Sequence, residues 1–399
     1  MEAVAAGHIC LDLTPGFASQ SGKNISEILS PGKLTKVSGI ALSTGGAVAN
    51  TGMALSVLGI DTQLMGKIGD DYFGGIILRI LKENNTEIAM TVLEGTKTSY
   101  TVILAPPGTD RIFLHDPGAN DTFCSADINY GIVGAVRLFH FGYPPVMKRM
   151  YENGGTELVE IFKKVKSLGV TTSLDMAVPD PSSEAGKVDW KSLLTKLLPW
   201  VDIFVPSIEE ILFMLEPEEY ARLNKMRGNG DLIKVLDMNI LQKLGDTLLA
   251  MGVRIVMLKC GKKGIYIRTA KAADLAAMGR ALPADMEDWS GRELIEETFF
   301  VPEVLSTTGA GDTSIAGFLS CLLKNFPLEE AIKIACATGS ECVQTYDALS
   351  GIKTLEETRV LLAKGWEKER IEISGSYWQY KENLAVWFGR QDTKFSTNV

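Results

Sequence analysis

The chain has 399 residues, of which 46% are hydrophobic, enough to fill the core of one large domain or two ordinary ones. Its net charge of −9 disfavours nucleic acid and membrane surfaces as partners, because binding phosphates over an extended site requires clustered Lys and Arg. The six cysteines include no CxxC pair and the three histidines are widely separated, which argues against a zinc site or a disulfide framework. No secretory signal is apparent, so we expect a cytoplasmic protein with small-molecule partners.

Short apolar runs alternate with helical patterns along most of the chain, which indicates a mainly parallel sheet covered by helices. Four predicted strands run into polar residues: Ile9 to Leu11 into Asp12, Val170 to Leu174 into Asp175, Val201 to Val205 into Ser207 after a proline, and Ile255 to Leu258 into Lys259. In open parallel sheets, ligands bind beyond the carboxyl ends of the strands. These four polar residues are therefore candidate site residues.

Two sections depart from the alternation and predict a separate small sheet. We expect one strand from Gly32 to Ser38, and a pair within Thr101 to His115 that is joined by a turn at Pro106 to Asp110. Between these sections, Gly39 to Ile60 has no charged residue. Its repeated glycines indicate a loop that leads into a buried helix, and they make a membrane helix the poorer explanation.

The later part of the chain predicts two insertions and an extension. The stretches Glu216 to Asp231 and Ala270 to Glu297 are irregular in pattern and are predicted to lie on the surface. The segment after Gly365 is rich in aromatic residues, unlike a disordered tail. We therefore predict one domain over residues 1–365 and a C-terminal extension, residues 366–399, that docks on the domain or on another subunit.

The segment from 299 to 326 has the pattern of a strand, a glycine turn and an amphipathic helix. Gly309, Ala310 and Gly311 then lie at a helix N-terminus, where free N–H groups and the helix dipole suit a phosphoryl group in transfer. Asp312 would repel phosphate unless it faces an acceptor hydroxyl and takes its proton. Taken alone, Asp312 is explained equally well as a helix cap. The P-loop, protein-kinase and dinucleotide-binding motifs are absent.

Two segments in this order resemble the ribokinase-like (PfkB) carbohydrate kinase family: STGGAVANTGMALSVLGIDTQLMGKIGDDYFG, residues 43–74, and STTGAGDTSIAGFLSCLL, residues 306–323. The resemblance covers about residues 4–352. It implies an α/β fold, a three-layer sandwich with a central mainly parallel sheet and a small β-sheet lid at about 13–44 and 93–120. It also implies an ATP-dependent carbohydrate kinase, with Asp312 as the base and the amides of Gly309 to Gly311 as an anion hole.

The resemblance assigns further residues to the two substrates and to the metal. The acceptor side is formed by Asp12, Gly45, Gly46 and Asn50. The nucleotide side is formed by Ser207, Lys259, Gly261, Gly264 and Thr308. Glu210 matches the glutamate of the family's N-x-x-E motif, which organises the waters of Mg²⁺, so Mg²⁺ is expected with ATP. Ser207 replaces the asparagine of that motif.

Three further expectations follow from the resemblance. Ser306 stands where members that use a potassium-like ion have aspartate, so a monovalent cation is possible but doubtful. The segment 106–121 favours a sugar as acceptor, and the alternatives are a nucleoside kinase of the same fold and a non-catalytic sugar-binding sensor. The lid of such kinases often forms a dimer contact, so a homodimer through the lid is possible.

Overall fold

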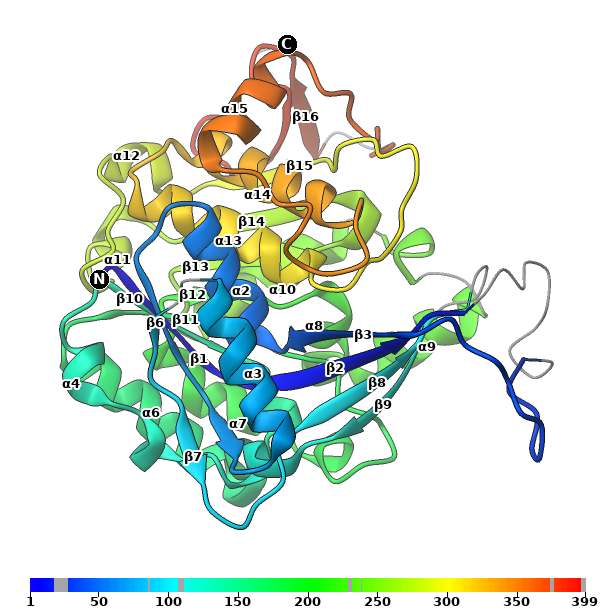
Figure 1. Cartoon of the computed structure of the whole chain (residues 1–399). Helices are drawn as coiled ribbons and strands as arrows, with labels where there is room; N and C mark the ends of the chain where they lie inside the picture. The colour runs from blue at the N-terminus through cyan, green and yellow to red at the C-terminus, as the bar shows by residue number, and fades with distance from the viewer. Residues whose placement is uncertain are drawn as a thin grey trace.

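The computed structural model describes residues 1–17, 28–84, 87–106, 111–228, 232–237, 239–373 and 377–395. In this part of the chain an 11-stranded sheet forms the centre of the molecule, in the order β16-β17-β15-β14-β13-β12-β11-β10-β1-β4-β6 (Figure 1). The strands from β13 to β6 are parallel, and the other four pair antiparallel at one edge. The eleven strands are β1 (Ala3–Gly7), β4 (Thr62–Met65), β6 (Glu87–Ile88), β10 (Leu138–Gly142), β11 (Thr171–Leu174), β12 (Ile203–Phe204), β13 (Ile255–Lys259), β14 (Ile265–Thr269), β15 (Glu293–Glu296), β16 (Trp378–Lys381) and β17 (Val386–Gly389).

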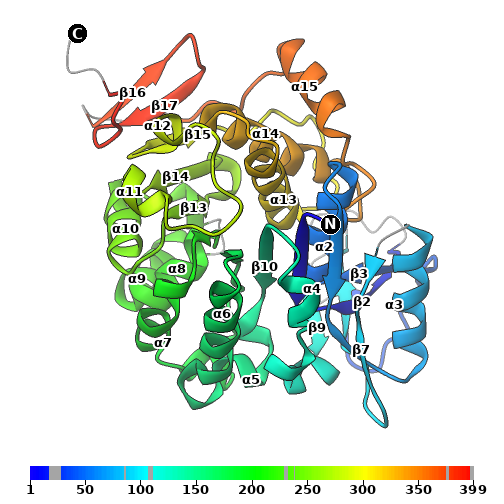
Figure 2. The same cartoon turned by 90° about the vertical axis from the view of Figure 1, so that its left-hand side faces the viewer.

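Helices cover both faces of this sheet (Figure 2). The helices of the described residues are α2 (Ala47–Val57), α3 (Tyr72–Glu83), α4 (Tyr130–Val133), α5 (Lys148–Tyr151), α6 (Thr156–Ser167), α7 (Trp190–Leu197), α8 (Ile208–Leu215), α9 (Pro217–Arg227), α10 (Asn239–Ala250), α11 (Ala272–Leu275), α12 (Met286–Trp289), α13 (Ala310–Leu323), α14 (Leu328–Cys342) and α15 (Leu355–Ala363).

The core has one layer on each side of the sheet. In β13, Ile255 and Met257 pack with α2, α13 and α14, whereas Val256 and Leu258 pack with α6, α7, α8 and α10. This alternation follows from the two-residue period of a strand, and a strand buried on both faces is therefore apolar throughout. Among the residues that the structure describes, we find no helix with the length and hydropathy to span a membrane.

A separate four-stranded sheet forms the lid, in the order β3-β2-β8-β9. Its strands are β2 (Cys10–Pro15), β3 (Ile40–Gly45), β8 (Tyr100–Leu104) and β9 (Ile112–Asp116), while β5 (Lys67–Gly69) and β7 (Thr91–Leu93) form a small pair of their own. The chain passes almost directly from β1 into β2, so the lid is connected to the central sheet (Figure 1). The α/β fold with a large mainly parallel sheet and a small lid is thus as predicted.

Several predicted elements were wrong in detail. The strand expected from Gly32 to Ser38 is absent, and the lid strand β3 begins only at Ile40. The pairing with β2 fixes this position, since Cys10 to Pro15 lie opposite Gly45 to Ile40. The strand expected directly before the glycine turn is also absent. Between β15 and α13, Phe299 forms an isolated bridge with Lys368 instead. The pair β8 and β9 is antiparallel as expected, but residues 107–110 of its predicted turn lie outside the described residues.

The first predicted insertion lies on the surface as expected, with Leu223 the one buried residue of α9, but it is regular, and the second prediction was wrong at its C-terminal end. Most of the first is the helix α9, although residues 229–231 of this stretch lie outside the described residues. The second contains β15, a fully buried strand of the central sheet. Its acidic residues favoured a surface position in the sequence, but cationic partners from distant segments bind them in the fold.

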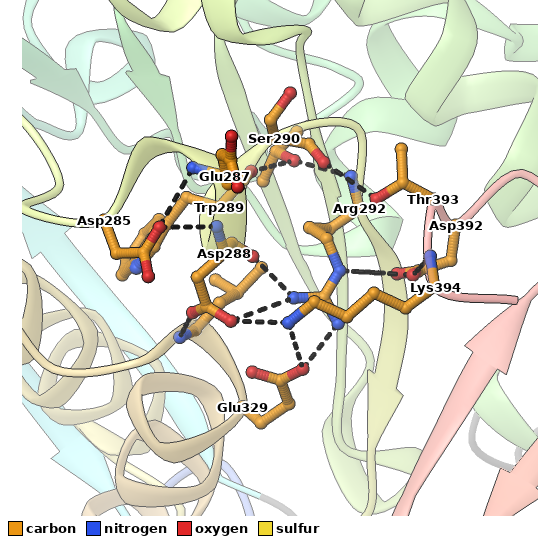
Figure 3. A network of polar contacts seen from close by, with 12 residues as sticks. Asp285, Glu287, Asp288, Trp289, Ser290, Arg292, Glu329, Asp392, Thr393 and Lys394 are labelled. Carbon is orange, nitrogen blue, oxygen red and sulfur yellow. Dashed lines mark hydrogen bonds and ion pairs between the residues drawn. The ribbon is translucent and has the colours of Figure 1, made fainter.

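The C-terminal extension continues the central sheet. β17 pairs with β15, with Leu294 opposite Phe388, and β16 pairs with β17. Arg292, which directly precedes β15, is 0% exposed (Figure 3). Its Nε lies 3.0 Å from Asp392 Oδ2, and its Nη2 lies 2.5 Å from Glu329 Oε1. The predicted extension therefore docks on the rest of the chain, while a domain boundary at residue 365 stays a prediction.

Candidate active site

The glycine turn of the sequence lies at the N-terminus of α13, as predicted. Gly309 is the N-cap of this helix, with φ 78°, and a side chain at this position would overlap Ala348. Positive φ and close packing both favour glycine here. The backbone of Gly309, Ala310 and Gly311 thus lies where N–H groups without helical partners and the helix dipole favour an anion.

Asp312 follows in the first turn of α13 and is held by three donors from other elements. Asn50 Nδ2 donates to Oδ2 over 2.9 Å, and Thr51 Oγ1 donates to Oδ1 over 3.3 Å. The Tyr143 hydroxyl lies 2.8 Å from both carboxylate oxygens. Burial raises the pKa of Asp312 above its ordinary value, and these bonds with the charge of Lys259 oppose the rise. The structure therefore joins the predicted Asp312 and Asn50 directly.

The acceptor side is formed where the lid meets α2. Asp12 lies within lid strand β2, and not after a strand of the central sheet as the sequence indicated, because β1 already ends at Gly7. A side chain at Gly45 would overlap the Asp12 carboxylate. Burial raises the pKa of Asp12 to about 6, and the charge of Asp312 adds to this rise. Asp12, Gly45 and Asp312 thus occupy one region of the molecule.

His8 is a neighbour of this region that the sequence prediction missed. A Cβ at Gly46, whose φ is 87°, would lie 2.6 Å from His8 Nδ1, so the imidazole approaches the backbone of the acceptor loop. Both ring nitrogens of His8 are buried and have no hydrogen-bond partner in the part of the chain that the structure describes, and burial holds its pKa well below the usual value. The ring lies 5.1 Å from that of His115 in the lid and 6.1 Å from that of Tyr143. His8 is therefore a neutral polar group at the acceptor side.

A buried ion pair lies beside the start of α13. Lys259 Nζ lies 2.6 Å from Asp175 Oδ1, and a Cβ at Gly311 would be 3.7 Å from the same ammonium. Burial alone would lower the pKa of Lys259, but Asp175, Glu210 and Asp312 together raise it. Burial raises the pKa of Asp175 to about 8, against the opposing effect of Lys259. Both residues lie at the carboxyl ends of strands, as the sequence predicted.

Ser207 and Glu210 form a reciprocal cap at the start of α8. Ser207 N donates to Glu210 Oε2 over 2.6 Å, and Glu210 N donates to Ser207 Oγ over 3.2 Å. Ser207 also bridges to Lys259, which brings the cap next to the ion pair. The carboxylates of Glu210 and Asp175 are oxygen donors of the kind that Mg²⁺ prefers, and the charge of Glu210 contributes to the raised pKa of Asp175. Among the described residues no group of three or more His, Cys, Asp or Glu lies together, so a magnesium ion held at Glu210 stays a prediction.

The remaining nucleotide-side residues have clear structural roles. Gly261 and Gly264 have φ of 53° and 90° in the turn between β13 and β14, and a side chain at Gly264 would overlap the carbonyl of Glu296. Thr308 N donates to Ser306 Oγ over 3.1 Å, and its carbonyl accepts from Cys342 Sγ over 3.3 Å. Their contacts with a nucleotide stay predictions.

Arg111 of the lid reaches the same turn. Its Nη1 donates to Ser306 Oγ over 3.4 Å, and its Nη2 donates to Thr307 Oγ1. The guanidinium therefore places a positive charge beside Ser306 and Thr307. The sequence did not indicate this contact, because 195 residues separate Arg111 from Ser306.

Residues 20–355 of the chain match the pfkB family carbohydrate kinases. The chain belongs to this family. As a PfkB carbohydrate kinase, the protein is a phosphotransferase with an alcohol group as acceptor.

Relatives agree with this assignment. The chain is 23% identical over 378 residues to fructokinase-2 of Zea mays, an alignment that covers 90% of this chain and 94% of the maize protein. Among solved structures, a putative ribokinase II from E. coli in complex with ATP and Mg²⁺ superimposes with a TM-score of 0.67 at 18% identity, covering 91% and 99% of the two chains. Arabidopsis thaliana ribokinase, complexed with ribose and ATP, gives a TM-score of 0.65 at 18% identity and covers 90% and 98%. The ribokinase-like fold is thereby confirmed.

Proposed function

We propose that this protein transfers the γ-phosphoryl group of ATP to a hydroxyl of a small, uncharged sugar. The observation that carries the proposal is the buried Asp312 carboxylate at the N-terminus of α13, with Asp12 close enough to interact electrostatically. A base and an anion-binding helix terminus are thus adjacent. The names of the maize fructokinase and of the ribokinase bound to ribose and ATP support a sugar and ATP as the substrates.

In the proposed reaction Asp312 takes the proton of the acceptor hydroxyl as its oxygen attacks the γ-phosphorus. The bond to the bridging oxygen breaks, and ADP leaves. The N–H groups of Gly309 to Gly311 stabilise the charge on the transferring group, and the Lys259 ammonium beside Gly311 adds a cation. Catalysis then consists of positioning and electrostatic stabilisation, as is general for phosphoryl transfer.

The acceptor is proposed to lie between the lid and α2. Asp12 would accept from two sugar hydroxyls, while the glycines at 45 and 46 let the sugar approach the backbone. Asn50 both donates and accepts hydrogen bonds. His8 is neutral, and neither ring nitrogen has a partner among the described residues, so it can exchange a hydrogen bond with a hydroxyl but supplies no charge to balance an acidic group. These groups support an uncharged acceptor.

The nucleotide is proposed to bind along Ser207, Lys259, Gly261, Gly264 and Thr308. Glu210 would hold Mg²⁺ through water, next to Asp175. When bound, Mg²⁺ neutralises charge on the phosphates of ATP. The Arg111 guanidinium at Ser306 already supplies a positive charge at this turn, which supports activity without a monovalent cation.

The proposal includes a second copy of the chain at the lid. The edge strands β3 and β9 expose Ile40, Leu42, Phe113 and Leu114, which are between 43% and 58% exposed. The strand registers place Ile40, Leu42 and Leu114 on one face of the lid, opposite to the face that carries Asp12, and exposed apolar side chains on one face favour association. Sedimentation of the purified protein tests this contact, with Leu114→Glu as the variant expected to give monomers.

An ADP-release screen tests the function. Sugars, sugar acids and nucleosides are each supplied with Mg-ATP, with and without potassium. We expect turnover with an uncharged sugar in both conditions. Turnover confined to nucleosides would support a nucleoside kinase, and binding of a sugar without any ADP release would support a sensor. Either outcome would overturn the proposal.

A further inference from the structure

Tyr143 is the closest neighbour of Asp312 that the proposed reaction does not use. It follows β10 directly, and its hydroxyl lies 2.8 Å from Oδ1 and 2.8 Å from Oδ2 of the carboxylate. A hydroxyl at the same distance from both oxygens contacts both of them at once. Asn50 and Thr51, both from α2, each bind one oxygen.

These three donors account for most of the hydrogen bonds that an ionised carboxylate accepts, about four in all. Asn50 and Thr51 belong to one helix, so they approach Asp312 from one element, whereas Tyr143 comes from the loop that follows β10. An acceptor hydroxyl that gives its proton to Asp312 must reach a lone pair of this carboxylate. The Tyr143 hydroxyl therefore competes with the acceptor hydroxyl for the oxygens of the base.

The backbone of Tyr143 supports a specific role. Its φ of 67° and ψ of 40° place a bulky residue in the left-handed region, where non-glycine residues are uncommon. Pro144 follows, and a proline favours extended conformations in the residue before it. The Tyr143 N–H donates to the Asp175 carbonyl over 3.3 Å, which helps to hold this conformation. Strained residues of this kind cluster at functional sites.

Tyr143 is suited to be a donor and not a base. Burial, with the charges of Asp312 and Asp175, raises the pKa of its hydroxyl well above the usual value. The phenol therefore stays protonated and keeps its proton directed at Asp312. The ring of His8, 6.1 Å away, places the same phenol at the acceptor side of the base.

We propose that Tyr143 guards the base against water: its hydroxyl covers the carboxylate oxygens of Asp312 until an acceptor hydroxyl displaces it. The inference rests on the proposed function. A sugar that displaces the phenol also gains contacts, such as those to Asp12, which offset the lost hydrogen bond. A water molecule gains no such contacts, so the exchange is unfavourable for water. Tyr143 is in this sense a positioning residue that favours transfer to the sugar over hydrolysis.

The reaction that the guard suppresses is hydrolysis of ATP. A water molecule at the oxygens of Asp312 would give one proton to the carboxylate while its own oxygen attacks the γ-phosphorus. The bond from phosphorus to the bridging oxygen would break, and ADP and inorganic phosphate would leave. This step requires only ATP and water, so it is measured without knowledge of the natural sugar.

The test is ADP release from Mg-ATP in the absence of any acceptor. For Tyr143→Phe, which removes the hydroxyl and keeps the ring, we expect the rate to rise about tenfold, the effect of one hydrogen bond to a charged group. In the double variant that carries both Tyr143→Phe and Asp312→Asn, the rise in acceptor-free ADP release should be abolished. Tyr130→Phe, which loses a half-buried hydroxyl bonded to Ser125 away from the site, should leave the rate unchanged.

An acceptor-free rate that stays unchanged or falls in folded Tyr143→Phe overturns the inference, since a merely structural role would lower hydrolysis and sugar phosphorylation together. Should this variant not fold, Tyr143→Asn, which tolerates positive φ, is expected to show the same rise. If the wild type phosphorylates a sugar but Tyr143→Phe shows no rise in acceptor-free ADP release, the guard is refuted and the proposed function stands. If acceptor-free ADP release rises in Tyr143→Phe but the wild type phosphorylates no sugar, the proposed acceptor is refuted and the guard stands. If neither result is obtained, both proposals are refuted.

Discussion

Removing the Asp392 side chain should strongly destabilise the protein, because it breaks the contact between the C-terminal extension and the buried Arg292 (Figure 3). Asp392 and Arg292 are 4% and 0% exposed. Asp392 also accepts from the backbone N–H of Glu293 and of Lys394, each over 2.8 Å. The single carboxylate therefore joins the extension to Arg292 and to Glu293 of β15, while its bond with Lys394 lies within the extension.

The expected cost of Asp392→Ala follows from what remains around the guanidinium. Leaving a buried charge without its partner costs about 3–5 kcal/mol of the free energy of unfolding. Glu329 and Asp288 still lie within 2.5 Å and 3.7 Å of Arg292, so we expect the lower end, about 3 kcal/mol. Glu329 belongs to α14, which packs on α13. The Arg292 cluster is therefore in contact with the helix that packs on the one carrying Asp312.

Urea unfolding followed by tryptophan fluorescence measures this cost. The matched control is Lys394→Ala, whose side chain is 43% exposed and pairs with Asp288 and Glu329 at the surface of the same cluster. Such an exposed pair contributes about 0–1 kcal/mol. Equal unfolding midpoints for Asp392→Ala and the wild type would show that the extension is not anchored through Arg292.

Three further results are expected. The Michaelis constant for the sugar should rise as the pH falls below about 6, because protonated Asp12 no longer accepts from two hydroxyls, and a constant value down to pH 5 would contradict this. Gly45→Ala should raise the same constant at least about tenfold by displacing Asp12, whereas Gly75→Ala, which meets nothing within 4 Å, should not. Lys259→Met should lower kcat about 10²-fold at saturating ATP, and near-normal kcat would remove Lys259 from the phosphoryl side.

The parts of the site that were predicted from sequence are those whose geometry is local. A helix N-terminus is formed by consecutive residues, so the pattern after Thr308 was sufficient to place Gly309, Gly311 and Asp312 together. Tyr143 is bonded to Asp312 across 169 residues, and no local pattern indicates that pairing. The rule that site residues follow the carboxyl ends of strands applies to both His8 and Tyr143, and it would have found them had β1 and β10 been delimited correctly.

The fold class was predictable because alternating strands and helices reflect the burial of both faces of a parallel sheet. β15 was not, because a strand with Glu293, Glu296 and an adjoining Arg292 has the composition of a surface segment. In the fold, Lys368 and Asp392 of the C-terminal extension bind Glu296 and Arg292, and Tyr377 and Gln391 of the extension donate to Glu293. Contacts between residues about 70 to 100 positions apart decide the location of this strand, and they leave no mark on its own sequence.

The most direct test of the central claim is the rate of sugar-dependent ADP release by Asp312→Asn, measured beside the exposed-loop control Asp180→Asn. Asparagine keeps the size of the side chain and its contact with Asn50, but it cannot take a proton. We predict that kcat falls at least about 10²-fold while the dissociation constant for ATP changes little. A kcat near that of the wild type would show that Asp312 is not the base.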